Sequence, residues 1–253
     1  MVNKEVLKYK NHLENCFKYI ADSDFINEKC SYISGNAKNI FSRLKNSSDK
    51  KIFFKIDPAW IIPLYGDDNF KNSSTCFLLT GCMDLEEKIS KYSYSATILS
   101  SSNMTQPETT INTSCCDLVH YNEDRVIRRF HLDLDVGSTS ITEPKSHLHY
   151  GGRILEEELQ AFPKLHYCID SKIGTPRFPH PPLDFILLFD LLLRQFNTTI
   201  DKKFVEDRYW KKLVKNSENF RLKQYYDSIL HYFSDEPIDK TLLELMSSTD
   251  FKV

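Results

Sequence analysis

Glycine is scarce in this chain, and its scarcity excludes the common nucleotide-binding loops. Only 7 of the 253 residues are glycine, and neither GxxxxGKS/T nor GxGxxG occurs. A loop of backbone amides that cradles phosphate groups is therefore not expected. The motif GxSxG is missing too, so the sequence gives no support to serine-hydrolase chemistry.

Long apolar runs, a leader-like segment and paired cysteines are missing as well. The most apolar segment, Phe185–Leu193, is shorter than the roughly 18 residues that a membrane span needs, and it contains Asp190. Residues 1–16 lack the apolar core of a signal peptide. The 7 cysteines are odd in number and form no CxxC pair, which favours reduced thiols. These absences predict a cytoplasmic protein that does not contact a membrane.

Neither sign of charge is in excess. The chain has 33 basic and 35 acidic residues and a net charge of −2, so nucleic acid would have to bind at a local basic patch. Hydrophobic residues make up 41% of the chain and aromatic residues 13%. This composition excludes a disordered protein and predicts a sizeable core.

The spacing of apolar residues predicts an α+β fold. Helices are expected at both ends, over 3–22 and 25–45 and then over 206–233, the last as one helix or two. A nearly all-apolar helix at 183–196 should begin near Pro182 and be buried against the sheet. We expect a single domain over 1–253, with N-terminal helices at 1–46, a sheet region at 50–172 and a C-terminal helical region at 182–248.

The sheet is predicted to be antiparallel and curved. Strands are expected at 51–56, 92–100, 116–121, 125–136, 146–150 and 164–169. Residues 122–124 would connect the third and fourth of these as a hairpin. Residues 58–68 indicate an irregular apolar segment after Asp57-Pro58 ends or bends the first strand. Residues 74–81 fit either a strand or a short buried helix.

The stretch from Arg128 to Arg153 holds the densest group of chemically active side chains. It contains three of the 8 histidines and two aspartates. Because side chains alternate along a strand, those at 131, 133 and 135 should project from one face. If the strand at 146–150 pairs antiparallel with this one, its two histidines join them on that face. We therefore predict a catalytic site made of His131, Asp133, Asp135, His147 and His149.

Imidazole and carboxylate groups together support two kinds of chemistry. They bind Zn, Mn, Ni or non-haem Fe, and they also act as acid–base pairs in which a carboxylate orients a histidine. A divalent metal ion, if one is used, is expected on His131, Asp133 and His147. The side chains expected to bind substrate are positive or near the site: Arg129, Arg153, Arg177 and His180.

A plainer alternative exists for the same residues. One face of an antiparallel sheet is often polar and solvated, and His131, Asp133 and Asp135 would then be only the wet side of an amphipathic strand. Two aspartates side by side on one strand repel each other unless a positive group compensates. An arginine in place of a metal ion could supply that charge, and the candidates are Arg129, Arg153 and Arg177.

The run RRFHLDLD…EPKSHLHYGG…GTPRFPHPPLDFILLFDLLLRQF resembles an uncharacterised prokaryotic family, domain of unknown function 2290, over roughly residues 125–196. The shared order is an Arg/Phe-Asp-type strand, a Pro-x-x-His strand followed by glycine, and a proline-rich helix start. The resemblance carries over to His147, at the Pro-x-x-His position, and to Arg177, whereas His149 departs from many members. A similar Pro-x-x-His-x-His strand occurs in small toxin-like proteins of toxin–antitoxin loci. The resemblance implies a bacterial protein of mobile or antiviral defence loci.

Three functions remain open from the sequence. The first is a component of an anti-phage defence or toxin-like system that acts on nucleic acid, as a nuclease with a His/Asp site and a divalent metal ion or acid–base catalysis. The second is a non-catalytic scaffold or regulatory subunit of a multi-protein complex with partners from the same locus, which the aromatic-rich C-terminal helices would suit. The third is a nucleotide or small-molecule sensor. The sequence therefore leaves open whether the protein is an enzyme.

Overall fold

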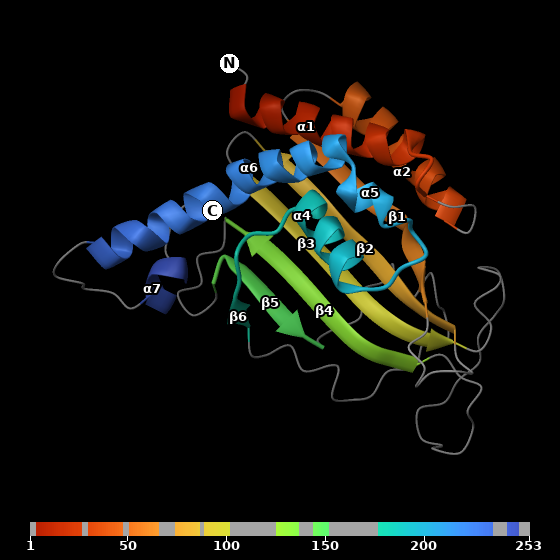
Figure 1. Ribbon diagram of the computed structural model, residues 1–253. Helices are drawn as coiled ribbons and strands as arrows, with labels where there is room; N and C mark the ends of the chain where they lie inside the picture. The colour runs from red at the N-terminus through yellow and green to blue at the C-terminus, as the bar shows by residue number, and fades with distance from the viewer. Residues whose placement is uncertain are drawn as a thin grey trace.

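The computed structural model describes residues 4–26, 30–47, 51–65, 74–86, 89–101, 125–136, 144–151, 177–234 and 242–247. Its centre is a curved antiparallel sheet in which the strands lie in chain order (Figure 1). The six strands are β1 (Lys51–Leu64), β2 (Ser74–Glu86), β3 (Ile89–Ser101), β4 (Arg125–Asp135), β5 (Ser146–Tyr150) and β6 (Phe178–Pro179). Every neighbouring pair is antiparallel.

Most of the helices gather on one face of this sheet, as Figure 1 shows. These are α1 (Lys4–Asp22), α2 (Ser31–Asn46), α4 (Phe185–Gln195), α5 (Lys203–Glu206) and α6 (Arg208–Ser234). The short helix α7 (Leu242–Ser247) contacts the start of β5, where Met246 accepts a hydrogen bond from the amide of Lys145. The predicted α+β class is confirmed, with helices at both ends of the chain. None of the helices in the described ranges combines the length and the apolar character that crossing a bilayer requires.

The buried central helix is also confirmed. In α4 the side chains from Phe185 to Asp190 are all buried, and Phe185 stacks on Phe17 of α1 with ring centroids 4.7 Å apart. The ring of Trp60 meets Phe185 edge-on at 5.4 Å. One hydrophobic cluster joins residues of the N-terminal helices, the sheet, α4 and α6. The core therefore lies between the sheet and the helices.

The prediction that β1 ends at Ile56 and gives way to an irregular segment is wrong. The strand runs on to Leu64, and its pairing with β2 shifts register between Ile56 and Trp60. Asp57-Pro58 lies at this irregularity, where a missing amide hydrogen is tolerated, and β1 is an edge strand of the sheet. Tyr32 of α2 caps this edge through a hydrogen bond from its hydroxyl to the carbonyl of Ile61.

Two alternatives that the sequence left open are decided by the structure. Residues 74–81 belong to a strand and not to a helix, and α6 is one continuous helix and not two. The proline-rich connector before α4 contains the short strand β6, which was not predicted. The pairing of β6 with β5 extends to His180, whose backbone amide donates to the carbonyl of Ser146 at 3.1 Å. The expected strand at 116–121 and its turn, the strand at 164–169, and Arg153 all lie outside the described residues.

Candidate metal centre

The pairing of β4 with β5 brings the predicted site residues together. His131 lies opposite His149, and Asp133 lies opposite His147. Directly paired residues share a face in an antiparallel sheet. The prediction that His147 and His149 share a sheet face with His131 and Asp133 is therefore confirmed, and this face is opposite the buried Leu132 of β4.

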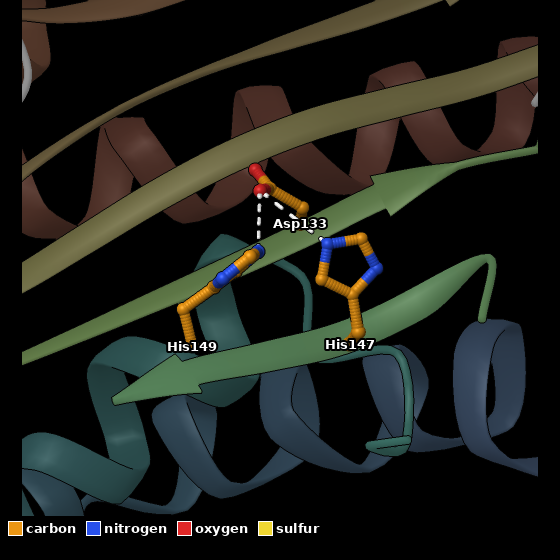
Figure 2. A group of neighbouring side chains, drawn as sticks. All are labelled: Asp133, His147 and His149. Atoms are coloured by element: carbon orange, nitrogen blue, oxygen red, sulfur yellow. Dashed lines mark ion pairs between the residues drawn. The ribbon is translucent and has the colours of Figure 1, made fainter. Parts of the chain in front are cut away.

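Asp133, His147 and His149 form the tightest group. Figure 2 shows both imidazole rings directed at the carboxylate from the neighbouring strand. Asp133 Oδ2 lies 3.6 Å from His147 Nε2 and 3.7 Å from His149 Nε2. One ligand atom from each of the three residues lies within 4.8 Å of the others. These separations are too long for hydrogen bonds and leave a gap between three ligand atoms.

Two of the separations suit a metal ion. A tetrahedral ion with ligands at about 2.1 Å separates its ligand atoms by about 3.4 Å, close to the 3.6 and 3.7 Å between Asp133 Oδ2 and the two Nε2 atoms. His147 Nδ1 lies 2.6 Å from the carbonyl oxygen of Pro144. Because a carbonyl only accepts, Nδ1 carries the proton and His147 Nε2 presents its lone pair to the gap. Two imidazoles and one carboxylate suit a first-row transition metal better than Mg²⁺ or Ca²⁺.

His131 plays a different part from the one predicted for it. Its Nε2 lies 2.8 Å from Asp133 Oδ1, the oxygen that faces away from the other two histidines. Burial alone would raise the pKa of Asp133, but the hydrogen bond from His131, with help from neighbouring side chains, holds that pKa well below its usual range. The geometry thus assigns His149 to the ligand position expected for His131.

Asp135 stands apart from this group. Its carboxylate pairs with Lys91 of β3 at 3.1 Å, and both side chains are about half exposed, at 46% and 52%. A surface ion pair of this kind contributes little to stability. The positive group that compensates Asp135 is therefore a lysine of the neighbouring strand, and the structure does not bring Asp135 into the candidate centre.

Burial decides between a functional group of side chains and a solvated sheet face. The side chains of His147 and His149 are only 5% and 8% exposed, and Arg129 is 2% exposed. The solvated alternative was stated for His131, Asp133 and Asp135. It fits Asp135, which is 46% exposed, but not His131 and Asp133, which are 12% and 26% exposed. Burying polar groups is costly unless they are paired, and the structure pairs them here: Arg129 donates to the carbonyl of Gly151, and His147 Nδ1 lies 2.6 Å from the carbonyl of Pro144.

The described residues that were predicted to bind substrate do not form one group, and each has its own surroundings. Arg129 donates from Nη1 to the carbonyl of Gly151 at 2.7 Å and is buried. Arg177 is exposed; continuing the β5–β6 register by one pair sets it opposite His149 and on the same face. His180 lies 2.7 Å from the carbonyl of Pro181 through Nδ1, and burial lowers its pKa.

Two residues of β3 near the candidate centre were not predicted from the sequence. Lys91 pairs with Asp135, and Ser93 Oγ lies 3.1 Å from His131 Nε2. The alternation of 92–100 indicated a strand, and odd-numbered polar residues on it were visible. What the sequence did not reveal was that this strand lies next to β4, with Ser93 opposite Asp133.

Fold and site together define an α+β protein with a candidate metal centre on a curved antiparallel sheet. No family model, curated protein or solved structure is significantly similar to the chain. The family resemblance over residues 125–196 therefore stays a prediction that rests on its own motifs.

Proposed function

We propose that this protein is a metal-dependent phosphodiesterase that cleaves nucleic acid, in a cytoplasmic bacterial anti-phage defence or toxin-like system. The observation that carries the chemistry is the group of Asp133, His147 and His149, with ligand atoms within 4.8 Å of one another. The cellular setting rests on the family resemblance, which implies mobile or defence loci. A protein partner encoded in the same locus belongs to this proposal.

Three protein ligands leave at least one coordination position open, which is the pattern of a catalytic metal site. Asp133, His147 and His149 would hold the metal ion, which would supply Lewis-acid chemistry for the attack of water on a phosphodiester. In the hydrolysis, water forms a new bond to phosphorus, the ester P–O bond breaks, one proton leaves the water for solvent and one reaches the departing oxygen. We expect the exposed Arg177, opposite His149 if the β5–β6 register continues by one pair, to bind a phosphate oxygen of the substrate.

Asp133 and Asp135 provide a matched test. They lie two residues apart on the same face of β4, but only Asp133 belongs to the group around His147. We expect purified protein to bind Zn²⁺, Mn²⁺ or Co²⁺ and to cleave single-stranded DNA or RNA. Asp133→Asn and His147→Ala should each lose metal binding and at least about 100-fold in cleavage rate. Asp135→Asn should change the rate less than threefold.

The proposal fails if the folded wild-type protein binds none of these ions, or if Asp133→Asn cleaves as fast as Asp135→Asn. Cell toxicity or phage restriction gives a second readout with the same pair of variants. Arg177→Gln should raise KM for an oligonucleotide more than it lowers kcat, because the side chain binds substrate and lies outside the metal ligands.

One observation favours a second function, a non-catalytic subunit in a complex. On α6, Tyr226, Leu230 and Phe233 are 49%, 64% and 66% exposed, and their spacing of four and three residues sets them on one side of the helix. Figure 1 shows this end of α6 reaching past the edge of the sheet. If this function is correct, Leu230→Lys with Phe233→Lys abolishes phage restriction while Asp133→Asn retains it.

A further inference from the structure

We propose that Arg129 and His131 are positioning residues that fix how Asp133 presents itself to the metal ion. This inference rests on the metal site proposed above and concerns residues outside the ligand set. It begins with the side chains of β4, where Arg129, His131 and Asp133 follow one another on the same face. Each touches the next, so a constraint on the first reaches the third.

Arg129 determines which nitrogen of His131 holds the proton. The guanidinium Nη1 donates to the carbonyl of Gly151 at 2.7 Å, and Nη2 lies 3.2 Å from His131 Nδ1. A guanidinium has only donors and stays protonated in proteins. His131 Nδ1 must therefore accept this hydrogen bond, which leaves the ring proton on Nε2. With Arg129 only 2% exposed, water does not easily replace it.

The proton on His131 Nε2 then orients the carboxylate. Nε2 donates to Asp133 Oδ1 at 2.8 Å, which fixes that oxygen. The other oxygen, Oδ2, is directed to the gap, 3.6 Å from His147 Nε2 and 3.7 Å from His149 Nε2. Asp133 is thus prepared to bind an ion through a single oxygen, and His131 is kept out of the ligand set. Residues that orient metal ligands in this way typically change metal affinity 10- to 100-fold.

A merely structural role for Arg129 makes a different prediction. If Arg129 served only to hold Gly151, its removal would weaken the centre whether or not His131 is present. If it acts through His131, its effect on metal affinity disappears once His131 is gone. A double-mutant cycle separates the two cases.

The affinity for Zn²⁺ is measured by competition with a chromogenic chelator, on protein shown to be folded by circular dichroism. We expect His131→Leu to weaken Zn²⁺ binding by about 10- to 100-fold, and Arg129→Met to weaken it by at least about tenfold. Arg129→Met added to His131→Leu should cause less than a twofold further loss. His131→Gln should stay within about threefold of wild type, because its amide offers one acceptor to Arg129 and one donor to Asp133.

Lys91→Met is the matched control, since Lys91 lies on the same sheet face but pairs with Asp135; it should leave Zn²⁺ affinity unchanged. Arg129→Lys replaces Arg129→Met in the cycle if the methionine variant does not fold. A lysine keeps the charge but cannot donate to both Gly151 and His131 in the same planar geometry. Arg129→Lys should weaken Zn²⁺ binding at least threefold when His131 is present, and less than twofold in the His131→Leu background. Equal losses in the two backgrounds overturn the inference.

Metal-free protein gives an independent readout. In ¹⁵N-labelled wild type, the ring of His131, assigned by its loss in His131→Gln, should show the tautomer protonated at Nε2. Substitution of Arg129 should convert it to a mixture or to the Nδ1 tautomer. If wild type binds no Zn²⁺, the proposed function falls, whereas the ring signals still decide the Arg129–His131 contact. An unchanged tautomer in the Arg129 variant contradicts the inference in every case.

Discussion

At the scale of single residues, Gly81 shows how tightly β2 and β3 are packed. Its φ is +156°, and a Cβ there would lie 2.2 Å from Tyr94 Cδ1 and 2.6 Å from the carbonyl oxygen of Ser93. Tyr94 is fully buried, so its ring cannot move away into solvent. The absence of a side chain at 81 is what allows the tyrosine ring to cross the strand.

Gly81→Ala should therefore destabilise the protein by at least about 2 kcal/mol, because the added methyl overlaps both a buried ring and backbone. The measurement is the free energy of unfolding in urea. Gly35→Ala is the control: nothing lies within 4 Å of its Cβ position in α2, so it should stabilise by about 0.5–1 kcal/mol. Equal effects of the two substitutions would refute the packing explanation.

The residues of the centre were predictable from the sequence to a large extent. Alternation along β4 placed His131 and Asp133 together, and His147 and His149 followed once the strands were assumed to pair. Which of these residues could bind a metal ion and which could only orient a ligand was not predictable, because this depends on the partner of each ring nitrogen. The 2.6 Å contact of His147 with Pro144 and the guanidinium beside His131 decide that, and both arise only in three dimensions.

At the scale of elements, a buried carboxylate ties three helices together. Asp184 caps α4 by accepting from the amide of Leu187 at 3.0 Å. Its other oxygen accepts from Tyr9 of α1 at 2.6 Å and from Ser217 of α6 at 2.9 Å. The fully buried Asp184 thus fixes the start of the central helix against both of its neighbours.

Asp184→Ala should lower the free energy of unfolding by at least about 3 kcal/mol, because it removes a helix cap and leaves buried donors without acceptors. Tyr9→Phe, which removes one donor and keeps the cap, should cost about 1–2 kcal/mol. In the Asp184→Ala background the same Tyr9→Phe change should cost less than about 0.5 kcal/mol. Thermal or urea unfolding measures all four proteins, and additive losses would show that the contact is energetically unimportant.

Elements were predicted well where apolar spacing was regular and less well where proline interrupted it. The periodicity of 3–22 and 183–196 gave helices close to α1 and α4. The proline in Asp57-Pro58 suggested the end of a strand, because proline cannot donate a backbone hydrogen bond. In the structure, pairing with β2 continues on both sides of this dipeptide, and Asn36 of α2 donates to the carbonyl of Asp57. The tertiary environment outweighed the local preference of the chain.

At the scale of the whole molecule, buried histidine makes stability depend on pH. Burial lowers the pKa of His12, with nearby Asp184 opposing that shift and Arg221 adding to it. His12 Nε2 lies 2.9 Å from the hydroxyl of Ser217. Because the unfolded chain takes up a proton near pH 6.5 while the folded chain resists it, acidification favours the unfolded state.

The free energy of unfolding should therefore fall between pH 7.5 and pH 5.5, by at most about 1.4 kcal/mol from His12. His12→Gln keeps a partner for Ser217 and removes the titration, so its stability should decline less over the same interval. Urea unfolding at the two pH values measures the difference between wild type and variant. A variant with the same decline as wild type would show that His12 does not contribute.

Alternation along β4 has a consequence for how this protein can change. Even-numbered residues such as Leu132 fill the core while odd-numbered residues such as Asp133 build the centre, so substitutions on one face leave the other intact. Insertion of a single residue within β4 would exchange the faces downstream of it, placing carboxylates in the core and leucines at the candidate metal centre. The strand thus tolerates replacement of its side chains far better than any change in its length.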